Sequence, residues 1–263
     1  MIKKLLIQAV FLIAMFISTW YILSQFDWIE ILKVKKTEAK LGELTWKLFK
    51  NKDKEVNDLF VKATIDSIVN RICIKNNIDK NSIKIHVLEK DEINAVSLPD
   101  RHLIIYTGLL SASENPEELS GVICHELAHI ELYHVTKKVT KEIGLSVVFS
   151  IAPGNVGADK IKQLAKVLSS SSFDRKLEKE ADIKAIDYLA KANIDPVCLV
   201  RFFNKMSKIE NDPASRYLSW INTHPDAKIR AKYVADQCKN KVFTSEQLTT
   251  VETWNTMRKR IDD

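Results

Sequence analysis

The stretch "GVICHELAHIELYH", residues 121–134, decides the fold because it places a metal-binding pattern on a helix. Its core, H-E-x-x-H, is typical of zinc hydrolases. Each helical residue turns the chain by about 100°, so His125 and His129 project from one face about 40° apart and can share one ion. Glu126 lies beside that face, where it can hold a water molecule and take its proton. The stretch therefore predicts two metal ligands and a general base.

The third histidine of the stretch does not complete this site. His134 follows His125 by nine residues, which places it about 180° away on a continuous helix. A zinc site that takes a third ligand so close by needs a glycine to turn the chain back, and "IELY" contains none. We therefore expect His134 to be structural or solvent-facing, and Glu131 to point away from the ion.

The third ligand is expected in residues 171–196, "SSFDRKLEKEADIKAIDYLAKANIDP". On a helix, Glu178 and Asp182 fall on the same stripe as the apolar residues, which is the face that packs on a core. Burying two acids is costly without compensation, and a metal with its histidines would supply it. The pattern predicts Glu178 as the ligand and Asp182 as a group that orients a ligand imidazole through its free N–H. A helix edge at which both acids reach water is the alternative, and Glu180, on the solvent side, is the rival ligand.

The order of predicted elements indicates an α+β fold. Alternating apolar residues predict strands over 82–89, 92–99 and 101–108. Asn115 and Pro116 predict the start of the H-E-x-x-H helix, as N-cap and first-turn residue. Apolar residues over 37–75 recur at helical spacing, and residues 138–171 look less regular, with Pro153, Gly154 and Gly157 as interruptions. Further helices are expected at about 174–193, 196–210, 225–240 and 245–260.

Several motifs in the same order resemble the gluzincin metallopeptidase family of HtpX, the CAAX prenyl endopeptidase and BepA, from about Ile85 to Arg230. They are "HELAH" and "EKEAD", with "NAVSLPDRHLIIYTGLL", "ANIDP" and "THPDAKIR". The closest branch is that of the small membrane-anchored or periplasmic members. Arg101 and Asn193 stand where the family pattern has glycine. Asparagine tolerates left-handed backbone geometry, whereas arginine is expected to change the hairpin turn.

The resemblance implies a mostly helical zincin-like domain with a small sheet, and roles for particular residues. His125, His129 and Glu178 would bind one Zn²⁺, and Glu126 would be the general base. Asn94, Ala95 and Val96 would form an edge strand that holds an extended peptide by strand addition. His224 would lie near the metal, where it steadies the oxyanion or covers the open position of the site.

The N-terminus predicts a membrane anchor. Two lysines precede an uncharged run from Leu5 to Phe26, and about 20 apolar residues are needed to span a bilayer. The run lacks the small-residue cleavage site of a secretory signal, so we favour a retained anchor over a cleaved signal. We expect an anchor over 1–26, a linker and the start of the first helix over 27–45, and the peptidase domain over 46–263. Lysines on both flanks leave the orientation open.

Composition adds few constraints on function. The 263-residue chain has 40 Lys+Arg and 34 Asp+Glu, a net charge of +6. Its lysines are scattered rather than clustered with aromatic residues, so nucleic acid is not an expected partner, whereas an anionic membrane surface is compatible. The four cysteines have no C-x-x-C spacing; Cys124 is expected to be buried, and Cys198 could pair with Cys238 in an oxidising compartment.

Together these observations predict a zinc-dependent endopeptidase that acts on unfolded, membrane or envelope proteins, with its domain on the extracytoplasmic side. One alternative is a catalytically weak zinc-containing module that binds peptides as a chaperone does. The presence of Glu126 counts against it. Another is a cytosolic peptidase with a fortuitous apolar tail, which the length of the apolar run disfavours.

Overall fold

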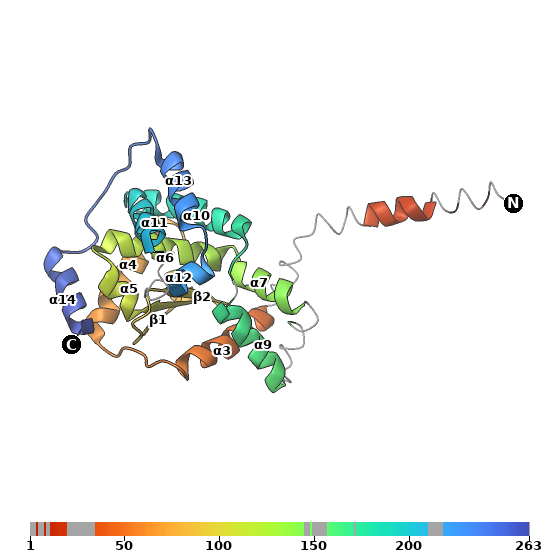
Figure 1. The fold of residues 1–263 in the computed structure, drawn as a ribbon, viewed down its shortest axis with the longest axis horizontal. Helices are drawn as coiled ribbons and strands as arrows, with labels where there is room; N and C mark the ends of the chain where they lie inside the picture. Colours follow the sequence, from red (N-terminus) through yellow and green to blue (C-terminus); the bar gives the residue numbers. More distant parts are fainter. Residues whose placement is uncertain are drawn as a thin grey trace.

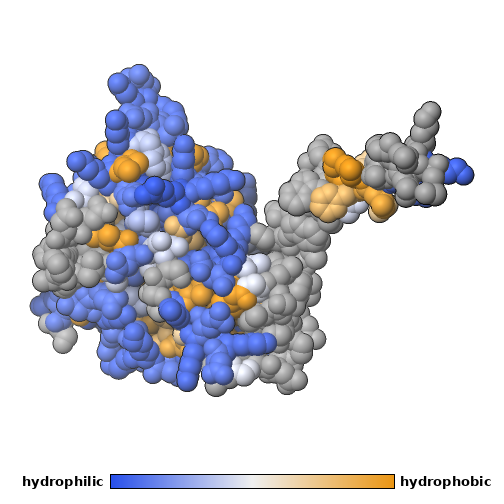
Figure 2. All heavy atoms as spheres, turned by 45° about the vertical axis from the view of Figure 1, so that its right-hand side comes forward, coloured by the Kyte–Doolittle hydropathy of each residue, from blue (hydrophilic) through white to orange (hydrophobic). Residues whose placement is uncertain are grey.

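The computed structural model describes residues 11–19, 35–144, 157–170, 172–209 and 218–262, together with Lys4, Gln8 and Val148. Most of the expected anchor, and the part of 138–171 that contains Pro153 and Gly154, lie outside these residues. Residues 11–19 are helical, and their large apolar side chains are exposed, as the orange surface in Figure 2 shows. Among the described helices, none is long and apolar enough to cross a bilayer.

The described chain is mostly helical with one small sheet, so the expected α+β class is confirmed (Figure 1). The strands are β1 (Lys84–Leu88), β2 (Ala95–Leu98) and β3 (His102–Tyr106), close to their predicted positions, and a short 3-10 helix, η1 (Lys80–Ser82), precedes them. The helices are α3 (Lys35–Lys50), α4 (Leu59–Lys75), α5 (Thr107–Ala112), α6 (Pro116–Glu131), α7 (His134–Ile143), α9 (Ala158–Ser170), α10 (Arg175–Lys191), α11 (Val197–Ile209), α12 (Leu218–Thr223), α13 (Ala227–Cys238) and α14 (Val251–Asp262).

The sheet has the strand order β1-β3-β2. The central strand β3 pairs in parallel with β1 and antiparallel with β2, and all five of its residues are buried. Among the described strands, β2 therefore lies at an edge and pairs with β3 alone. Because successive side chains point to opposite faces, Leu103 and Ile105 enter one core while Ile104 and Tyr106 enter another.

The two cores hold different helices against the two faces of the sheet. The larger core contains buried residues of α4, α6, α10 and α11. The smaller core contains residues of α3, α7 and α9, including Leu41, Val139 and Leu168. Helix α6 packs against α10, α11 and β2, and almost every residue from Pro116 to Ile130 is buried. The helix that carries H-E-x-x-H is thus held in place by packing against its neighbours around almost its whole circumference.

Helix α6 begins where the sequence predicts. The side chain of Asn115 accepts a hydrogen bond from the backbone N–H of Glu118, and Pro116 occupies the first turn. The acidic Glu117 and Glu118 lie at the positive end of the helix dipole. The start of the helix that carries the metal motif is therefore encoded locally.

Several boundaries differ from the prediction. The region 37–75, for which the spacing predicts helical structure, forms the two helices α3 and α4, and Asp58 caps α4 by accepting hydrogen bonds from the N–H groups of Phe60 and Val61. Within 138–171, helices α7 and α9 occupy most of the described residues, which are thus more regular than expected, while Pro153 and Gly154 lie outside the described residues. Helices α5 and α12 were not anticipated, and α14 begins later than predicted, at Val251.

The two replaced glycines keep the backbone geometry of glycine. Asn193 has a φ of 56°, as the tolerance of asparagine predicts, and Arg101 has a φ of 63°. The expectation that Arg101 changes the hairpin is wrong in this respect, since the residue adopts the left-handed conformation itself. Its guanidinium forms an ion pair with Glu131. The C-terminal end of α6 is thereby joined to the β2–β3 turn.

The four cysteines are free and buried. Cys124 is inside the core beside the metal motif, as expected for a small apolar residue. The anticipated pairing of Cys198 with Cys238 is not formed in the structure. Burial raises the pKa of the Cys238 thiol and of the Cys198 thiol, the latter to about 12, so both thiols are protonated at neutral pH.

Candidate metal centre

Helix α6 carries His125, Glu126 and His129 into the middle of the protein. All three side chains are fully buried. The Nε2 atoms of His125 and His129 lie 3.0 Å apart, as expected for two histidines one turn apart on one face. The spacing of the motif and the burial of α6 together bring two ring nitrogens to one point.

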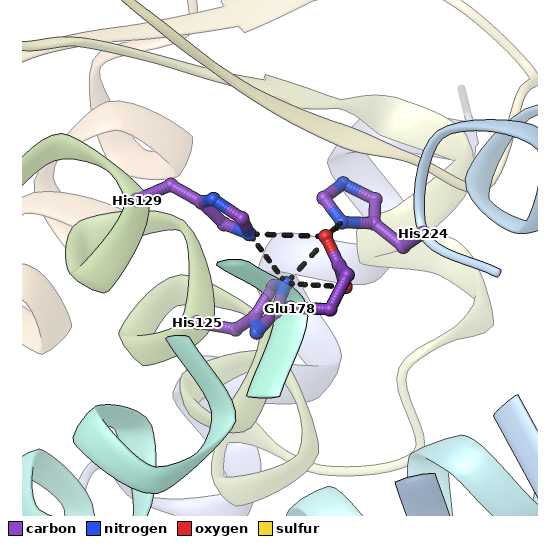
Figure 3. A group of neighbouring side chains, drawn as sticks. All are labelled: His125, His129, Glu178 and His224. Atoms are coloured by element: carbon purple, nitrogen blue, oxygen red, sulfur yellow. Dashed lines mark hydrogen bonds and ion pairs between the residues drawn. The ribbon is translucent and has the colours of Figure 1, made fainter. Parts of the chain in front are cut away.

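Helix α10 brings Glu178 to the same point. Its Oε1 lies 3.3 Å from His129 Nε2 and its Oε2 lies 3.5 Å from His125 Nε2. The segment after α12 adds His224, whose Nδ1 lies 2.9 Å from Glu178 Oε1. Donor atoms of these four buried residues all lie within 4.8 Å of one another (Figure 3). Three nitrogens and one carboxylate from three separate segments thus converge.

Asp182 lies one turn after Glu178 on α10 and faces His125 from behind. Its Oδ1 lies 2.9 Å from His125 Nδ1. Burial lowers the pKa of His125 to about 3, so the imidazole is neutral. A proton on Nδ1 that is donated to Asp182 leaves the lone pair of Nε2 directed at the centre. The contact therefore provides the geometry that the sequence predicts for Asp182.

Arg230 of α13 was assigned no role from the sequence, although it ends the "THPDAKIR" motif. Its guanidinium is 3% exposed and lies 2.6 Å from Glu178 Oε2 and 2.7 Å from Asp182 Oδ1. Burial opposes ionisation of both acids, yet Arg230, with His224 beside Glu178 and His125 beside Asp182, holds the pKa of each carboxyl below its usual value. Tyr233, one turn further on, also donates to Asp182.

The environment of Glu126 differs from that of Glu178. Its Oε2 accepts a hydrogen bond of 2.8 Å from the backbone N–H of Ser97 in β2. Its Oε1 is buried without a hydrogen-bond partner in the described part of the chain and lies 3.4 Å from His224 Nε2. Burial raises the pKa of Glu126 to about 7, within the range that suits a general base.

A cavity of about 20 Å³ borders Glu126, His224 and Ser97. A space of that size holds about one water molecule. Phe173 and Leu168 line the same cavity, and the Phe173 ring stacks on His129 with 4.1 Å between centroids. The space beside Glu126 therefore suits a single water, and a peptide would have to displace part of this wall to enter.

Of the two roles predicted for His134, structural or solvent-facing, the structure has the first, although the geometry expected for it is wrong. Helix α6 ends at Glu131, and Tyr133 adopts a left-handed conformation with a φ of 55°, after which α7 begins at His134. The assumption of one continuous helix therefore fails, although no glycine makes the turn. His134 is fully buried and its Nδ1 lies 3.0 Å from His129 Nδ1.

His134 approaches His129 from the side opposite the four converging donor atoms. Its other nitrogen, Nε2, faces Glu180 Oε2 at 3.4 Å. Because a carboxylate only accepts, the proton of neutral His134 belongs on Nε2, and His129 Nδ1 then donates to His134 Nδ1. This arrangement leaves the lone pair of His129 Nε2 directed at the centre. Glu180, the rival ligand from the sequence, contacts His134 instead of the donor cluster.

The donor set fits a zinc ion. His125 Nε2 lies 3.0 Å from His129 Nε2 and 3.3 Å from His224 Nδ1, and the contacts of Asp182 and His134 assign lone pairs to the first two of these atoms. Lone pairs that face each other at such distances need a cation between them. Imidazole nitrogens with a carboxylate oxygen are common zinc ligands.

The predicted peptide-binding strand is β2 and the residue before it. Asn94 O accepts from Tyr106 N, and Val96 pairs with Ile104, so these residues bond to β3. In an antiparallel pair the intervening residues turn their backbone groups outward, which places Ala95 and Ser97 on the free side. Ser97 N–H bonds to Glu126, and the outer edge of β2 therefore runs directly past this carboxyl.

Comparisons with known proteins place the chain among metallopeptidases. The family model described as "Peptidase family M48" matches residues 61–237. The chain is 26% identical over 198 residues to mitochondrial metalloendopeptidase OMA1 of Arabidopsis thaliana, covering 75% of this chain and 40% of that protein. It is 28% identical over 168 residues to metalloprotease LoiP of Escherichia coli, covering 62% of this chain and 65% of that protein. A putative beta-barrel assembly-enhancing protease of Vibrio cholerae is 24% identical over 200 residues, covering 72% of this chain and 41% of that protein. The aligned part of the chain thus covers less than two thirds of the length of each of these relatives.

Proposed function

The chain belongs to peptidase family M48, a family of zinc metallopeptidases, and from this premise we propose that it is a zinc-dependent endopeptidase. One observation carries the proposal. Four metal-binding side chains converge in the core, and the carboxyl of Glu126 lies beside them at a cavity that holds about one water. A structural zinc site needs no such carboxyl or water space, whereas hydrolysis needs both.

His125, His129 and Glu178 would hold the ion. A catalytic zinc site has three protein ligands and one open position, whereas a structural site is closed by four. When bound, zinc supplies a Lewis acid that lowers the pKa of water to about 7 and polarises a carbonyl. His224 lies close enough to cover the open position, and its ring touches both Glu178 and Glu126. We assign it the role of covering that position or steadying the oxyanion.

Glu126 is assigned the proton transfers. Its side chain lines the water-sized cavity. Its Oε1 has no hydrogen-bond partner among the described residues, while Oε2 accepts from Ser97 N–H. The carboxylate takes a proton from the attacking water and then delivers it to the leaving amine. Glu126 is thus again ionised at the end of the reaction. Asp182 and Arg230 keep His125 and Glu178 in place during these steps.

The outer edge of β2 is assigned to the substrate. An extended peptide that adds to an edge strand satisfies its backbone hydrogen bonds there, and this mode of recognition is largely independent of sequence. Because Ser97 N–H bonds to Glu126, a peptide alongside Asn94, Ala95 and Val96 would pass the general base. The substrates we propose are unfolded, membrane or envelope polypeptides, a choice supported by the names of the relatives and the apolar N-terminus rather than by the site.

A Glu126→Gln variant tests the function. We expect zinc content to stay at one ion per chain, while hydrolysis of an unfolded polypeptide such as reduced casein falls by a factor of about 10² to 10⁴. Zinc would be measured by atomic emission and cleavage by mass spectrometry. The matched control is Glu131→Gln, since this acid lies on the same helix and pairs with Arg101 away from the centre.

Two results would contradict the proposal. Full proteolysis by the Glu126→Gln protein would remove Glu126 from the mechanism. Binding of unfolded polypeptide by the wild-type protein without any cleavage would favour the peptide-binding module in place of the enzyme.

We also propose a membrane location and a domain division. Residues 1–26 would anchor the chain and place the domain on the extracytoplasmic side, where quality control of envelope proteins would take place. The expected linker over 27–45 overlaps α3, whose Leu41 is buried in the smaller core. We therefore place the start of the folded domain at α3 instead of at residue 46.

A further inference from the structure

A second, larger cavity opens from the space beside Glu126. Its volume is about 380 Å³, within the range of ligand pockets. Val96, Leu168 and Thr223 line both cavities, so the larger one continues the cleft along β2 towards Asn94. A peptide that lies on the edge of β2 would pass over it immediately beside the cleaved bond.

Part of the wall of this cavity is apolar. Leu48 and Phe49 of α3 face it from one side, Val96 of β2 and Leu168 of α9 from others. Such walls suit the methylene stem of a long side chain, because burying each methylene contributes about 0.8 kcal/mol. Leu48 and Phe49 precede residue 61, where the match to the family begins. This part of the cavity is therefore formed outside the shared region.

Three polar atoms that belong to lining residues have no partner. Asp53 Oδ2, Asn94 Oδ1 and Ser219 Oγ are buried, and none has a hydrogen-bond partner in the described chain. Asn94 is 4% exposed. Two of the three atoms can only accept hydrogen bonds, and a buried acceptor without a donor is costly. These oxygens of the lining residues are therefore without a hydrogen-bond donor in the described chain.

The charges around the cavity indicate which donor would fit. Lys90 is paired with Glu92 at 2.8 Å and its ammonium lies over the Tyr106 ring. Lys52 is exposed to solvent. Asp53 is in no ion pair with any described residue, so its carboxylate is the one acidic group of the lining without a counter-charge.

We propose that this cavity binds the side chain of a lysine or arginine of the polypeptide substrate, next to the cleaved bond. The stem lies against Phe49, Val96 and Leu168, and the cationic end donates to Asp53, with Asn94 and Ser219 as further acceptors. For a peptide antiparallel to β2, the residue is on the C-terminal side of the bond, because β2 runs from Asn94 towards Ser97 and Glu126. This assignment rests on the proposed peptidase function.

The experiment uses the full zinc-loaded chain in detergent. Cleavage sites in reduced casein, mapped by mass spectrometry, give the position at which basic residues are enriched. Matched peptides with arginine, methionine or glutamate at that position then give kcat/KM. We expect kcat/KM for the arginine peptide to exceed that for the methionine peptide by about tenfold or more, which is the effect of one charge-assisted hydrogen bond. Asp53→Asn should bring this ratio to about one, and Asp53→Lys should favour glutamate.

Binding to a Glu126→Gln background separates the two proposals, because it needs no turnover. There the arginine peptide should bind about tenfold more tightly than the methionine peptide, and Asp53→Asn should remove the difference. Equal binding of the two peptides, or a preference that survives Asp53→Asn, would overturn the basic pocket while leaving the peptidase intact. Binding with the expected preference but no cleavage by the wild type would instead overturn the peptidase.

The control variant is Glu252→Gln, which removes an exposed carboxylate of α14 and should leave the arginine-to-methionine ratio unchanged. Thermal unfolding of each variant verifies the fold. Asp53→Asn keeps the size of the side chain, so a large fall in melting temperature is not expected.

Discussion

Arg230 is the residue that allows two carboxylates to lie in the interior. Glu178 and Asp182 are 2% and 0% exposed, and a buried carboxylate without a partner is expensive. The guanidinium forms an ion pair with Glu178 through Nη1 and donates hydrogen bonds to Asp182 from Nε and Nη2. It thereby fixes Glu178 at the donor cluster and Asp182 behind His125, and one arginine connects a proposed ligand with the group that orients another.

His134 acts at the same scale on the other histidine. We predict that His134→Ala lowers zinc affinity by about 10- to 100-fold, the usual effect of removing a group that orients a metal ligand. The reason is that His129 loses the acceptor that holds its proton on Nδ1. Competition with a chromophoric zinc chelator measures the change.

The matched control for this substitution is His102→Ala. His102 is also a buried histidine, but it lies on β3 and contacts His86 rather than the centre, so zinc affinity should stay the same while stability falls. Glu178→Ala should abolish stoichiometric binding, whereas Glu180→Ala should weaken it less than His134→Ala does. An unchanged affinity in a folded His134→Ala protein would remove His134 from the site.

At the scale of elements, helix α3 packs directly on the β2–β3 turn. A Cβ added to Gly42 would lie 2.4 Å from the Cβ of Asp100 and 2.7 Å from the carbonyl oxygen of Pro99. The neighbouring Trp46 stacks on His86, with 3.6 Å between ring centroids. The absence of a side chain at Gly42 is what lets α3 approach the hairpin and cover that face of the sheet.

Gly42→Ala tests this close approach. Replacing glycine by alanine within a helix ordinarily stabilises it by about 1 kcal/mol, but overpacking against backbone costs about 1–3 kcal/mol. We expect the second effect to prevail, so the free energy of unfolding should fall. Chemical denaturation measures it.

Ala39→Gly is the control that measures the difference in helix propensity between alanine and glycine without a packing effect, because Ala39 is an exposed residue of the same helix. It should cost no more than about 1 kcal/mol. A Gly42→Ala protein as stable as the wild type, or more stable, would show that α3 does not need the close approach.

For the whole molecule, we propose separate roles for the residues from α3 onward and for the N-terminal apolar run. The described helical residues 11–19 expose large side chains, with Phe11 at 68% and Phe16 at 69%. Exposed apolar surface of this kind marks a site of contact with a membrane or a partner. The net charge of +6 by itself does not distinguish an anionic membrane surface from an anionic partner. Together with this apolar run, it favours the membrane surface.

We predict that the full chain, produced in bacterial cells, stays in the membrane fraction after extraction with alkaline carbonate, and that deletion of residues 1–26 releases it. The physical reason is that a run of about 20 apolar residues is long enough to cross the hydrocarbon core. Protease added to spheroplasts should digest the domain of the full chain. A domain that is degraded only after lysis of the inner membrane would contradict the proposed side.

The sequence by itself determined the features that depend on local spacing. The alternation of residues 82–108 determined the sheet, Asn115 and Pro116 determined the start of α6, and helical periodicity determined that His125, His129, Glu178 and Asp182 face inward. These could be predicted because each depends on a repeat of two or 3.6 residues, or on a single cap.

Only the tertiary structure decided how distant segments meet. The turn at Tyr133, which carries no glycine signal, brought His134 back to His129, and the packing of α13 on α11 and α10 placed Arg230 between the two acids. The cavity at Asp53 likewise depends on α3, β2, α9 and α12, which are far apart in the sequence and all contribute to its lining. Such contacts are set by the packing of whole elements. They could not be predicted because the periodicity of the sequence around a residue does not indicate which distant residues contact its side chain.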